Sequence, residues 1–144
     1  MGLGEPFFAS VESEISRMAF SIPAIKGIEF GAGFNVAKMT GSQNNDNIID
    51  ADGHTETNHA GGINGGISNG NPIVFRVAVK PTPSISLSQD TFNIKDGKVE
   101  PLVIQGRHDL CIVLRVPPVL EAAAAIALAD LSLVAQTAKR VFTK

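Results

Sequence analysis

The chain is poor in cysteine and has almost no net charge, and both deficits narrow the classes of protein to consider. Cys111 is the single cysteine among 144 residues, so an internal disulfide and a cysteine-rich zinc site are excluded. We expect Cys111 to be a small buried thiol, in keeping with a reducing cytoplasm. The formal net charge is −2, which gives no electrostatic support to nucleic-acid or membrane binding. A chain of this length suits one domain, residues 1–144.

Several motifs of catalysis and nucleotide binding are also missing. No G-x-G-x-x-G opens a helix after a strand, and no Gly-Lys-Ser/Thr follows the glycine-rich segment, so neither a dinucleotide fingerprint nor a P-loop is present. No serine stands in a G-x-S-x-G elbow, and nothing in the sequence pairs Cys111 with a histidine, so nucleophilic catalysis has no support. The first residues, MGLGEPFF, lack the basic-plus-apolar pattern of a signal peptide.

The longest apolar run is interrupted by charge. Residues 119–129 are almost wholly apolar and residues 131–134 resume the run, but Glu121 and Asp130 fall within it and alanine is the dominant residue. This composition favours a buried helix of a soluble domain over a transmembrane span.

Glycine, by contrast, is concentrated in one stretch. Five glycines fall between residues 61 and 70, in the near-repeat GGIN then GGIS, directly before the strand-like run PIVFRVAV and the turn KPTPS. Glycine tolerates positive φ and allows close approach of the backbone to a ligand, at an entropic cost. The interleaved isoleucines and asparagines favour an ordered, ligand-facing loop over a flexible linker. Its backbone N–H groups are also suited to hold a phosphate.

The first half of the chain predicts a helix, a strand and a long loop. Glu5 and Pro6 are typical of a helix start, and apolar residues recur at helical spacing up to Pro23, so we expect a helix over residues 5–20. Residues 25–30 predict a short strand. Residues 34–39 either continue this strand or begin a turn. Residues 40–57 are polar and rich in Asn and Asp, and we expect a long loop, partly disordered without a ligand or partner.

The second half predicts strands followed by a helix. We expect strands over residues 73–79 and 85–87, and a hairpin whose strands, 91–94 and 99–104, flank the Asp-Gly turn at residues 95–98. A long alanine-rich helix follows from Pro117 to about Val141, with Lys139 and Arg140 in its last turn. This order predicts an α+β domain with helices packed on an antiparallel sheet, because strands and helices do not alternate regularly.

The tripeptide Arg107-His108-Asp109 interrupts the apolar pattern after Gly106 with three side chains capable of chemistry. Arg107 is either a ligand for a carboxylate or phosphate or an ordinary surface arginine. Asp109 either accepts a proton or orients a cofactor N–H, or it caps a turn. For His108 a structural role is favoured. Lys80, at the end of a strand, is suited to an anionic group, although a plain strand-end lysine is favoured.

Two histidines in the polar loop raise the question of a metal. His54 and His59 lie five residues apart, with Asp52 and Glu56 nearby. Histidines in a polar loop are usually solvated, so we expect no metal site here.

Taken together, the segments resemble the chorismate synthase family over essentially the whole chain. The motifs that carry the resemblance are GIEFGAGF (27–34), Gly41-Ser42, TNHAGGINGGISNG (57–70), KPTPSI (80–85) and GRHD (106–109). Members are much longer than this chain, which is similar to their C-terminal portion alone. The two family histidines assigned to proton transfer, most of the substrate arginines and the part associated with NADPH belong to the other portion. No histidine of this chain inherits those roles.

The resemblance implies the last step of the shikimate pathway, in aromatic amino acid biosynthesis. The family converts 5-enolpyruvylshikimate 3-phosphate to chorismate by a 1,4-anti elimination of phosphate and requires reduced FMN without net redox change. It implies FMN contacts at Pro23, Ala24, Gly65, Lys80, Pro81, Thr82, Pro83, Ser84 and Arg107. Asp109 matches the family aspartate proposed to deprotonate the flavin. The implied assembly is a cytoplasmic homotetramer, with this chain one half of a β-α-β sandwich, and no nucleic acid, membrane or metal.

The chain departs from the family pattern next to the implied catalytic aspartate. Leu110 stands where members usually have proline, and Leu114 at another position where proline is common. Without the first proline the backbone after Asp109 is less restrained, which loosens the aim of its carboxylate. Two other readings remain open: a non-catalytic piece that serves in oligomerisation or pairs with the missing portion, and a module that only binds FMN, phosphate or a nucleotide.

Overall fold

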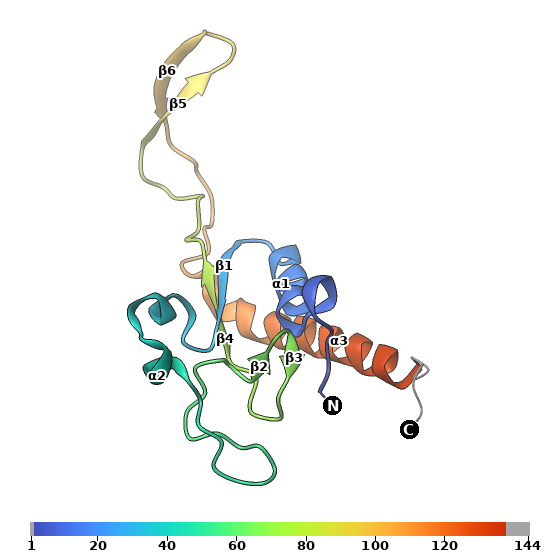
Figure 1. The fold of residues 1–144 in the computed structure, drawn as a ribbon. Coiled ribbons are helices and arrows are strands. Elements are labelled where there is room, and N and C mark those ends of the chain that lie inside the picture. Colours follow the sequence, from blue (N-terminus) through green and yellow to red (C-terminus); the bar gives the residue numbers. More distant parts are fainter. Residues whose placement is uncertain (1, 138–144) are drawn as a thin grey trace.

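The computed structural model describes residues 2–137 as an α+β fold from which a long two-stranded arm projects (Figure 1). The α+β class predicted from the sequence is confirmed. The strands form three antiparallel pairs rather than one continuous sheet. The pairs are β1 (Ile25–Phe30) with β4 (Phe75–Val79), β2 (Ile63–Asn64) with β3 (Ile67–Ser68), and β5 (Gln89–Asn93) with β6 (Lys98–Leu102).

Helix α1 spans Val11–Ser21, so the helix start predicted at Glu5 is wrong. Phe7 has a φ of 66°, which an α-helix cannot contain, and residues Phe7–Ala9 form only one 3₁₀ turn, η1. Ser10 is extended instead, and its hydroxyl accepts a hydrogen bond from the Ser13 N–H at 3.0 Å. Such an N-cap satisfies one of the free N–H groups at a helix start. The chain turns out of the helix at Ile22, immediately before Pro23.

The core lies where α1 meets the other elements. Val11 and Ile15, one helical turn apart on α1, are almost completely buried. They pack against Ile63 of β2 and against Ala127 and Leu131 of the C-terminal helix. Burial of each large aliphatic side chain contributes about 1.5–3 kcal/mol, so this small cluster is the main apolar stabilisation of the fold.

Strands β1 and β4 pair in a register that places complementary side chains opposite each other. Phe30 lies opposite Phe75, with ring centroids 5.8 Å apart, and Glu29 lies opposite Arg76, with an ion pair at 2.9 Å. An irregularity between Ile25 and Gly27 shifts the register at the start of β1. The strands predicted over residues 25–30 and 73–79 are therefore confirmed, the second with a later start.

Between β1 and the glycine-rich segment the chain forms short local elements. Residues Gly33–Lys38 are a 3₁₀ helix, η2, so residues 34–39 do not continue the strand. Helix α2 (Gly41–Asn44) follows inside the predicted loop, and its capping box joins Thr40 and Gln43. Farther on, a single β-bridge links Ile48 and Thr55.

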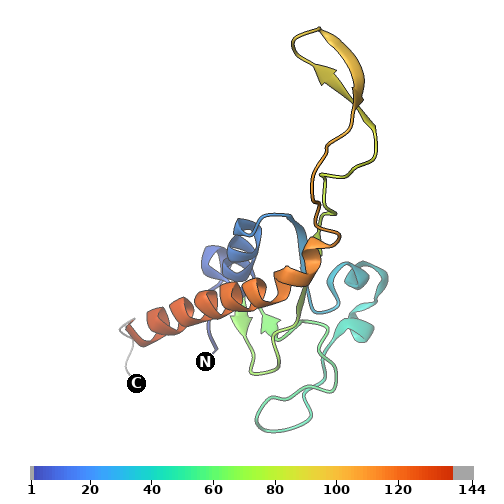
Figure 2. The ribbon, with the colours of Figure 1, turned by 180° about the vertical axis from the view of Figure 1, so that it is seen from behind.

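The arm consists of β5 and β6 and extends away from the body in both views (Figures 1 and 2). The predicted hairpin is confirmed with slightly earlier bounds. Its turn contains Gly97 with a φ of 64°, and the Gly97 N–H donates to the Asn93 carbonyl at 2.9 Å. Residues 85–87 are not a strand, so that prediction is wrong. No neighbouring segment offers them a ladder in the described chain, and a strand requires one.

The C-terminal helix α3 spans Val116–Thr137, directly after the 3₁₀ helix η3 (Ile112–Arg115). It runs alongside α1 (Figure 2) and buries one face, which includes Ala123, Ala127 and Leu131. Val119, Ile126 and Leu133, on an adjoining side of the helix, are exposed, so the helix predicted as buried is only half covered. Residues Ile112–Ala135 are long and apolar enough to cross a membrane, a test that core helices of soluble proteins also pass. Lys139 and Arg140 lie outside the described residues.

Candidate functional site

Two segments that the sequence marked separately meet at the end of the β1–β4 ladder. The Lys80 N–H donates to the Ala24 carbonyl at 2.9 Å, one step beyond the pair Ile25–Val79. Ala24 has a φ of 77°, a strained conformation for a residue with a Cβ. The register of the ladder thus places Pro23-Ala24 beside the first residue of the KPTPS turn.

The KPTPS turn also forms one wall of a groove of about 340 Å³. Lys80, Pro81 and Thr82 line this wall, and the opposite wall comes from residues 110–113, which follow Asp109. The Thr82 hydroxyl oxygen is buried and makes no hydrogen bond with any described residue. A buried hydroxyl without a partner is costly, so Thr82, a lining residue of the groove, carries an unsatisfied polar group.

Farther along, the turn meets the GRHD motif through His108. The Ser84 Oγ lies 3.2 Å from His108 Nδ1, and His108 Nε2 lies 3.1 Å from the Ile104 carbonyl oxygen. The sequence alone favoured a structural role for His108. The structure places its ring between the outgoing and returning limbs of the arm, against a residue implied to contact flavin. Side chains 24 residues apart carry no local pattern that would have predicted this contact.

Arg107 and Asp109 flank His108 and are both exposed. The Asp109 carboxylate is 55% exposed and lies 3.6 Å from the Arg115 guanidinium. At this distance and exposure the pair contributes little to stability. The pair keeps a cation beside the carboxylate, and Arg115, which the sequence analysis did not single out, supplies it.

Cys111 is exposed, so the prediction of a buried thiol is wrong. It lines the groove next to Leu110, whose side chain is also fully exposed. The apolar run 110–114 lies at the surface because η3 turns the chain back toward α3 before these residues reach the core.

The glycine-rich segment divides into packing glycines and open ones. A Cβ on Gly61, Gly62 or Gly66 would lie within 2.6 Å of a neighbouring atom, and all three have positive φ. Gly66 also accepts a hydrogen bond from the Val11 N–H at 2.9 Å, which holds the segment against the start of α1. Gly65, in contrast, has a φ of 58° and open space where a Cβ would stand. Close backbone packing accounts for three glycines, and only Gly65 and Gly70 are open.

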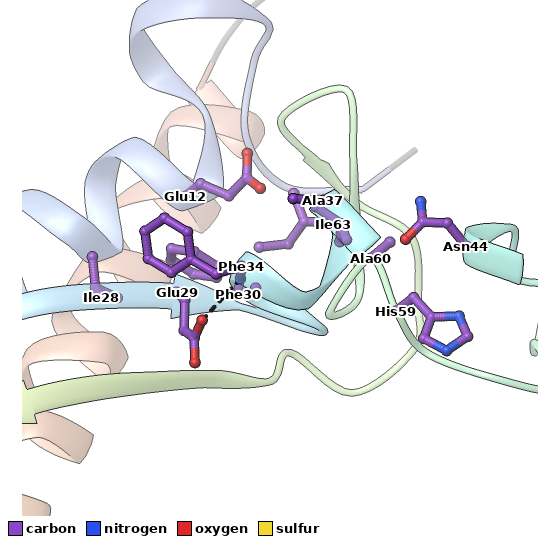
Figure 3. Close-up of a pocket in the computed structure, with 12 residues that line it drawn as sticks. Glu12, Ile28, Glu29, Phe30, Phe34, Ala37, Asn44, His59, Ala60 and Ile63 are labelled. Atoms are coloured by element: carbon purple, nitrogen blue, oxygen red, sulfur yellow. Dashed lines mark hydrogen bonds between the residues drawn. The ribbon is translucent and has the colours of Figure 1, made fainter. Parts of the chain in front are cut away.

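Figure 3 shows a second hollow, of about 430 Å³, between α1, β1 and the glycine-rich segment. Glu29 on its wall accepts hydrogen bonds from the Phe34 N–H and from Arg76, each at 3.0 Å. This carboxylate therefore already has partners within the chain. None of the residues implied to contact flavin lines this hollow.

Near that hollow, Asp46 joins the polar loop to the glycine-rich segment. Its carboxylate accepts from the His59 N–H and the Thr57 hydroxyl at 2.7 Å each and from the Ala60 N–H at 2.9 Å. Burial raises the pKa of Asp46, but the N–H groups of Ala60 and His59, the Thr57 hydroxyl and the adjacent imidazole outweigh burial and lower it.

The histidines of the loop do not share a metal site. His54 lies 2.6 Å from Asp50, whose pKa is lowered chiefly by this hydrogen bond. With Asp52 the two place ligand atoms within 4.8 Å of one another, all exposed. His59 instead lies 3.2 Å from Asp46. The expected absence of a metal stays a prediction.

The arrangement suits an anionic ligand. Lys80 and Arg107 supply cations, Thr82 and Ser84 supply hydroxyls, and the two prolines of the turn restrict its backbone. Contacts of the described residues join Pro23-Ala24 to the turn and the turn to His108. Gly65 lies apart from them, in the tight connection between β2 and β3.

Comparisons with known proteins agree on one family. The chorismate synthase family profile matches residues 1–133. The chain is 66% identical to chorismate synthase of Chitinophaga pinensis over 142 residues, which are 99% of this chain and 43% of that protein. It is 50% identical to chorismate synthase of Archaeoglobus fulgidus over 131 residues, 90% of this chain and 36% of that protein.

A solved structure supports the same conclusion. The fold superposes on a crystal structure of chorismate synthase with a TM-score of 0.70 and 34% sequence identity, covering 94% of this chain and 34% of that one. The chain thus spans about two fifths of the length of the curated relatives it matches. With a profile that matches almost all of it and relatives that share half or more of its residues, the chain belongs to the chorismate synthase family.

Proposed function

We propose that this chain supplies much of the reduced-FMN site of a chorismate synthase. The reaction is the 1,4-anti elimination of phosphate from 5-enolpyruvylshikimate 3-phosphate to give chorismate. The observation that carries the proposal is the convergence of Ala24, the KPTPS turn and the GRHD motif at the base of the arm. These three segments are distant in the sequence, and all three contain residues implied to contact flavin.

In this proposal the side chains at the base of the arm bind and orient the cofactor. Lys80 and Arg107 neutralise its phosphate or electron-rich ring oxygens. Thr82 offers the buried hydroxyl that has no partner within the described chain, which is the position a bound group would satisfy. Pro81 and Pro83 hold the turn rigid, and the backbone of Pro23, Ala24 and Gly65 allows close approach. When bound, reduced FMN supplies reducing power that the reaction returns, so that no net oxidation occurs.

Asp109 is the proposed proton acceptor. A carboxylate that is 55% exposed, with the Arg115 cation 3.6 Å away, is accessible to a ligand proton. Leu110 follows it without the restraint that proline would impose. We expect the carboxylate to be held less firmly than in members with proline at that position.

A second function is favoured by the exposed face of α3. Val119, Ile126 and Leu133 leave an apolar surface of the kind that oligomers cover. The chain then serves as an assembly or FMN-binding module without turnover of its own. We propose that residues 1–144 are one domain, that the protein assembles as a homo-oligomer, a tetramer as in the family, and that it acts in the cytoplasm.

An anaerobic titration tests the flavin site directly. The purified chain is titrated with reduced FMN, with and without 5-enolpyruvylshikimate 3-phosphate, and its folding is checked by circular dichroism. Saturable binding that Arg107→Ala weakens about tenfold or more supports the proposal, because a charge-assisted contact is worth about 1.5–3 kcal/mol. Arg17→Ala removes an exposed arginine bonded to Glu14 and is the matched control. A folded chain that ignores reduced FMN, or that binds equally well without Arg107, contradicts it.

A further inference from the structure

His108 makes two hydrogen bonds whose directions can be worked out. Its Nε2 lies 3.1 Å from the Ile104 carbonyl oxygen, which can only accept, so Nε2 carries the hydrogen and donates. A neutral imidazole carries one N–H, and its second nitrogen is then an acceptor. Nδ1 therefore accepts, and the group that donates to it is the Ser84 hydroxyl at 3.2 Å.

In this pairing the Ser84 side chain uses its only hydrogen-bond donor, the hydroxyl hydrogen. Among the described residues, the contact with His108 is the only hydrogen bond that the Ser84 hydroxyl makes. Its oxygen keeps free lone pairs and no free hydrogen, so it can accept from a ligand but cannot donate. Without His108 the hydroxyl would rotate and do either.

The KPTPS turn then presents different chemistry along its length. Lys80 at its start is a cation, and Thr82 in the middle has a buried hydroxyl free to donate or accept. Ser84 at its end is restricted to accepting. A phosphate or a carbonyl oxygen, which are acceptors, suits the first two positions and is disfavoured at the third.

We propose that His108 is a positioning residue that fixes the Ser84 hydroxyl as a hydrogen-bond acceptor for a hydroxyl or ring N–H group of the bound flavin. The proposal rests on the proposed function for its ligand. It gives the bound flavin a direction at the base of the arm, with a donor group at Ser84 and the phosphate away from it. The pairing of His108 with Ser84 belongs to the free chain and can be measured without flavin.

The first test is a long-range ¹H–¹⁵N spectrum of the histidine-labelled chain at neutral pH. The chain has three histidines, and His108→Phe identifies the signals of His108 by their loss. The proposal requires the neutral tautomer with hydrogen on Nε2. Hydrogen on Nδ1, or a doubly protonated ring, overturns it.

The second test is anaerobic titration of four variants with reduced FMN. We expect Ser84→Ala to weaken binding about tenfold, the loss of one hydrogen bond. His108→Phe should weaken it about threefold, because the freed hydroxyl loses its orientation. His108→Asn keeps an acceptor for Ser84 and should remain within about twofold of the wild type. In the double variant, His108→Phe should add nothing to Ser84→Ala.

The outcomes separate this inference from the proposed function. If His108→Phe weakens binding equally with and without Ser84, its effect does not pass through the hydroxyl and the inference is wrong. If the folded chain does not bind reduced FMN at all, the proposed function fails and the flavin part of the inference fails with it. The tautomer spectrum then still decides whether His108 fixes the Ser84 hydroxyl.

Discussion

Removing the carboxylate of Asp46 tests whether the polar loop is held by buried hydrogen bonds. The Asp46 side chain is 9% exposed and accepts three hydrogen bonds from the segment that begins at Thr57. Asp46→Asn keeps its shape but turns one oxygen into an N–H₂ group. One donor loses its partner and the others lose a charged acceptor. Since a hydrogen bond to a charged group is worth about 1.5–3 kcal/mol, we expect a loss of about 2–4 kcal/mol in the free energy of unfolding.

Asp50 provides a matched control in the same loop. Its carboxylate also accepts two backbone N–H groups, of Asp52 and His54 at 3.0 Å each, and lies 2.6 Å from the His54 ring. Its side chain is 41% exposed, so water replaces these partners readily. We expect Asp50→Asn to destabilise the chain much less than Asp46→Asn does. The chain has no tryptophan or tyrosine, and urea unfolding is therefore followed by far-ultraviolet circular dichroism.

The stabilisation by Asp46 should also depend on pH in a definite direction. The pKa of Asp46 is lower in the folded chain than its ordinary value, so the folded state keeps this carboxylate ionised when the unfolded state has bound a proton. The stabilisation is fully present above the ordinary aspartate pKa of about 3.9 and is lost as the pH falls through the lowered folded value. The gap between wild type and Asp46→Asn should narrow below about pH 4. A gap no larger than that of Asp50→Asn, or one that is constant in acid, refutes the reasoning.

Two further predictions concern the glycine-rich segment and α3. Gly66→Ala places a Cβ 2.6 Å from that of Ser10 at a φ of 84°, so it should destabilise by more than about 2 kcal/mol in urea. Gly65→Ala has open space for its Cβ and is strained only by the left-handed backbone conformation, so it should cost about 1 kcal/mol. Equal losses of stability in the two variants contradict the distinction between closely packed and open glycines. If the exposed face of α3 is an oligomer contact, Ile126→Glu, at a residue 58% exposed, should weaken association at least tenfold in sedimentation velocity. Ile48→Glu, on the polar loop, is the control, and identical sedimentation of both variants rejects the contact.

The elements that the sequence predicted well are those whose signal is local. The hairpin has an Asp-Gly turn between apolar runs, and β1 is a short segment with isoleucine and phenylalanine, bounded by Pro23 and Gly31. The prediction of where α1 starts was wrong because Glu5-Pro6 is as good a local signal for a helix start as Ser10. What decides between them is the packing of Gly66 against Ser10 and the bond from the Val11 N–H, both long-range.

The contacts among the predicted site residues could not be predicted from the sequence. The motif resemblance marked Ala24, Lys80, Ser84 and Asp109, yet no periodicity relates them. The bond between Lys80 and Ala24 depends on the register of β1 against β4, which pairs Ile25 with Val79 across an irregular step. A sequence pattern specifies that two strands form more readily than which residues face each other. The burial of Cys111 was predicted wrongly for a related reason. Apolar neighbours indicate burial only where the fold places that segment in the core, and the sequence does not show this.

The topology of the arm explains how two distant motifs come into contact. The chain leaves β4 at Lys80, runs out along β5, returns along β6 and arrives at Arg107, so both motifs lie at the base of one hairpin (Figure 1). The β5–β6 ladder pairs residues from Gln89–Leu102 to Asn93–Lys98. This register determines which residues of the outgoing and returning limbs lie opposite each other at the base of the arm. A shift of this ladder by one residue would turn its side chains to the opposite face and move Ser84 away from His108.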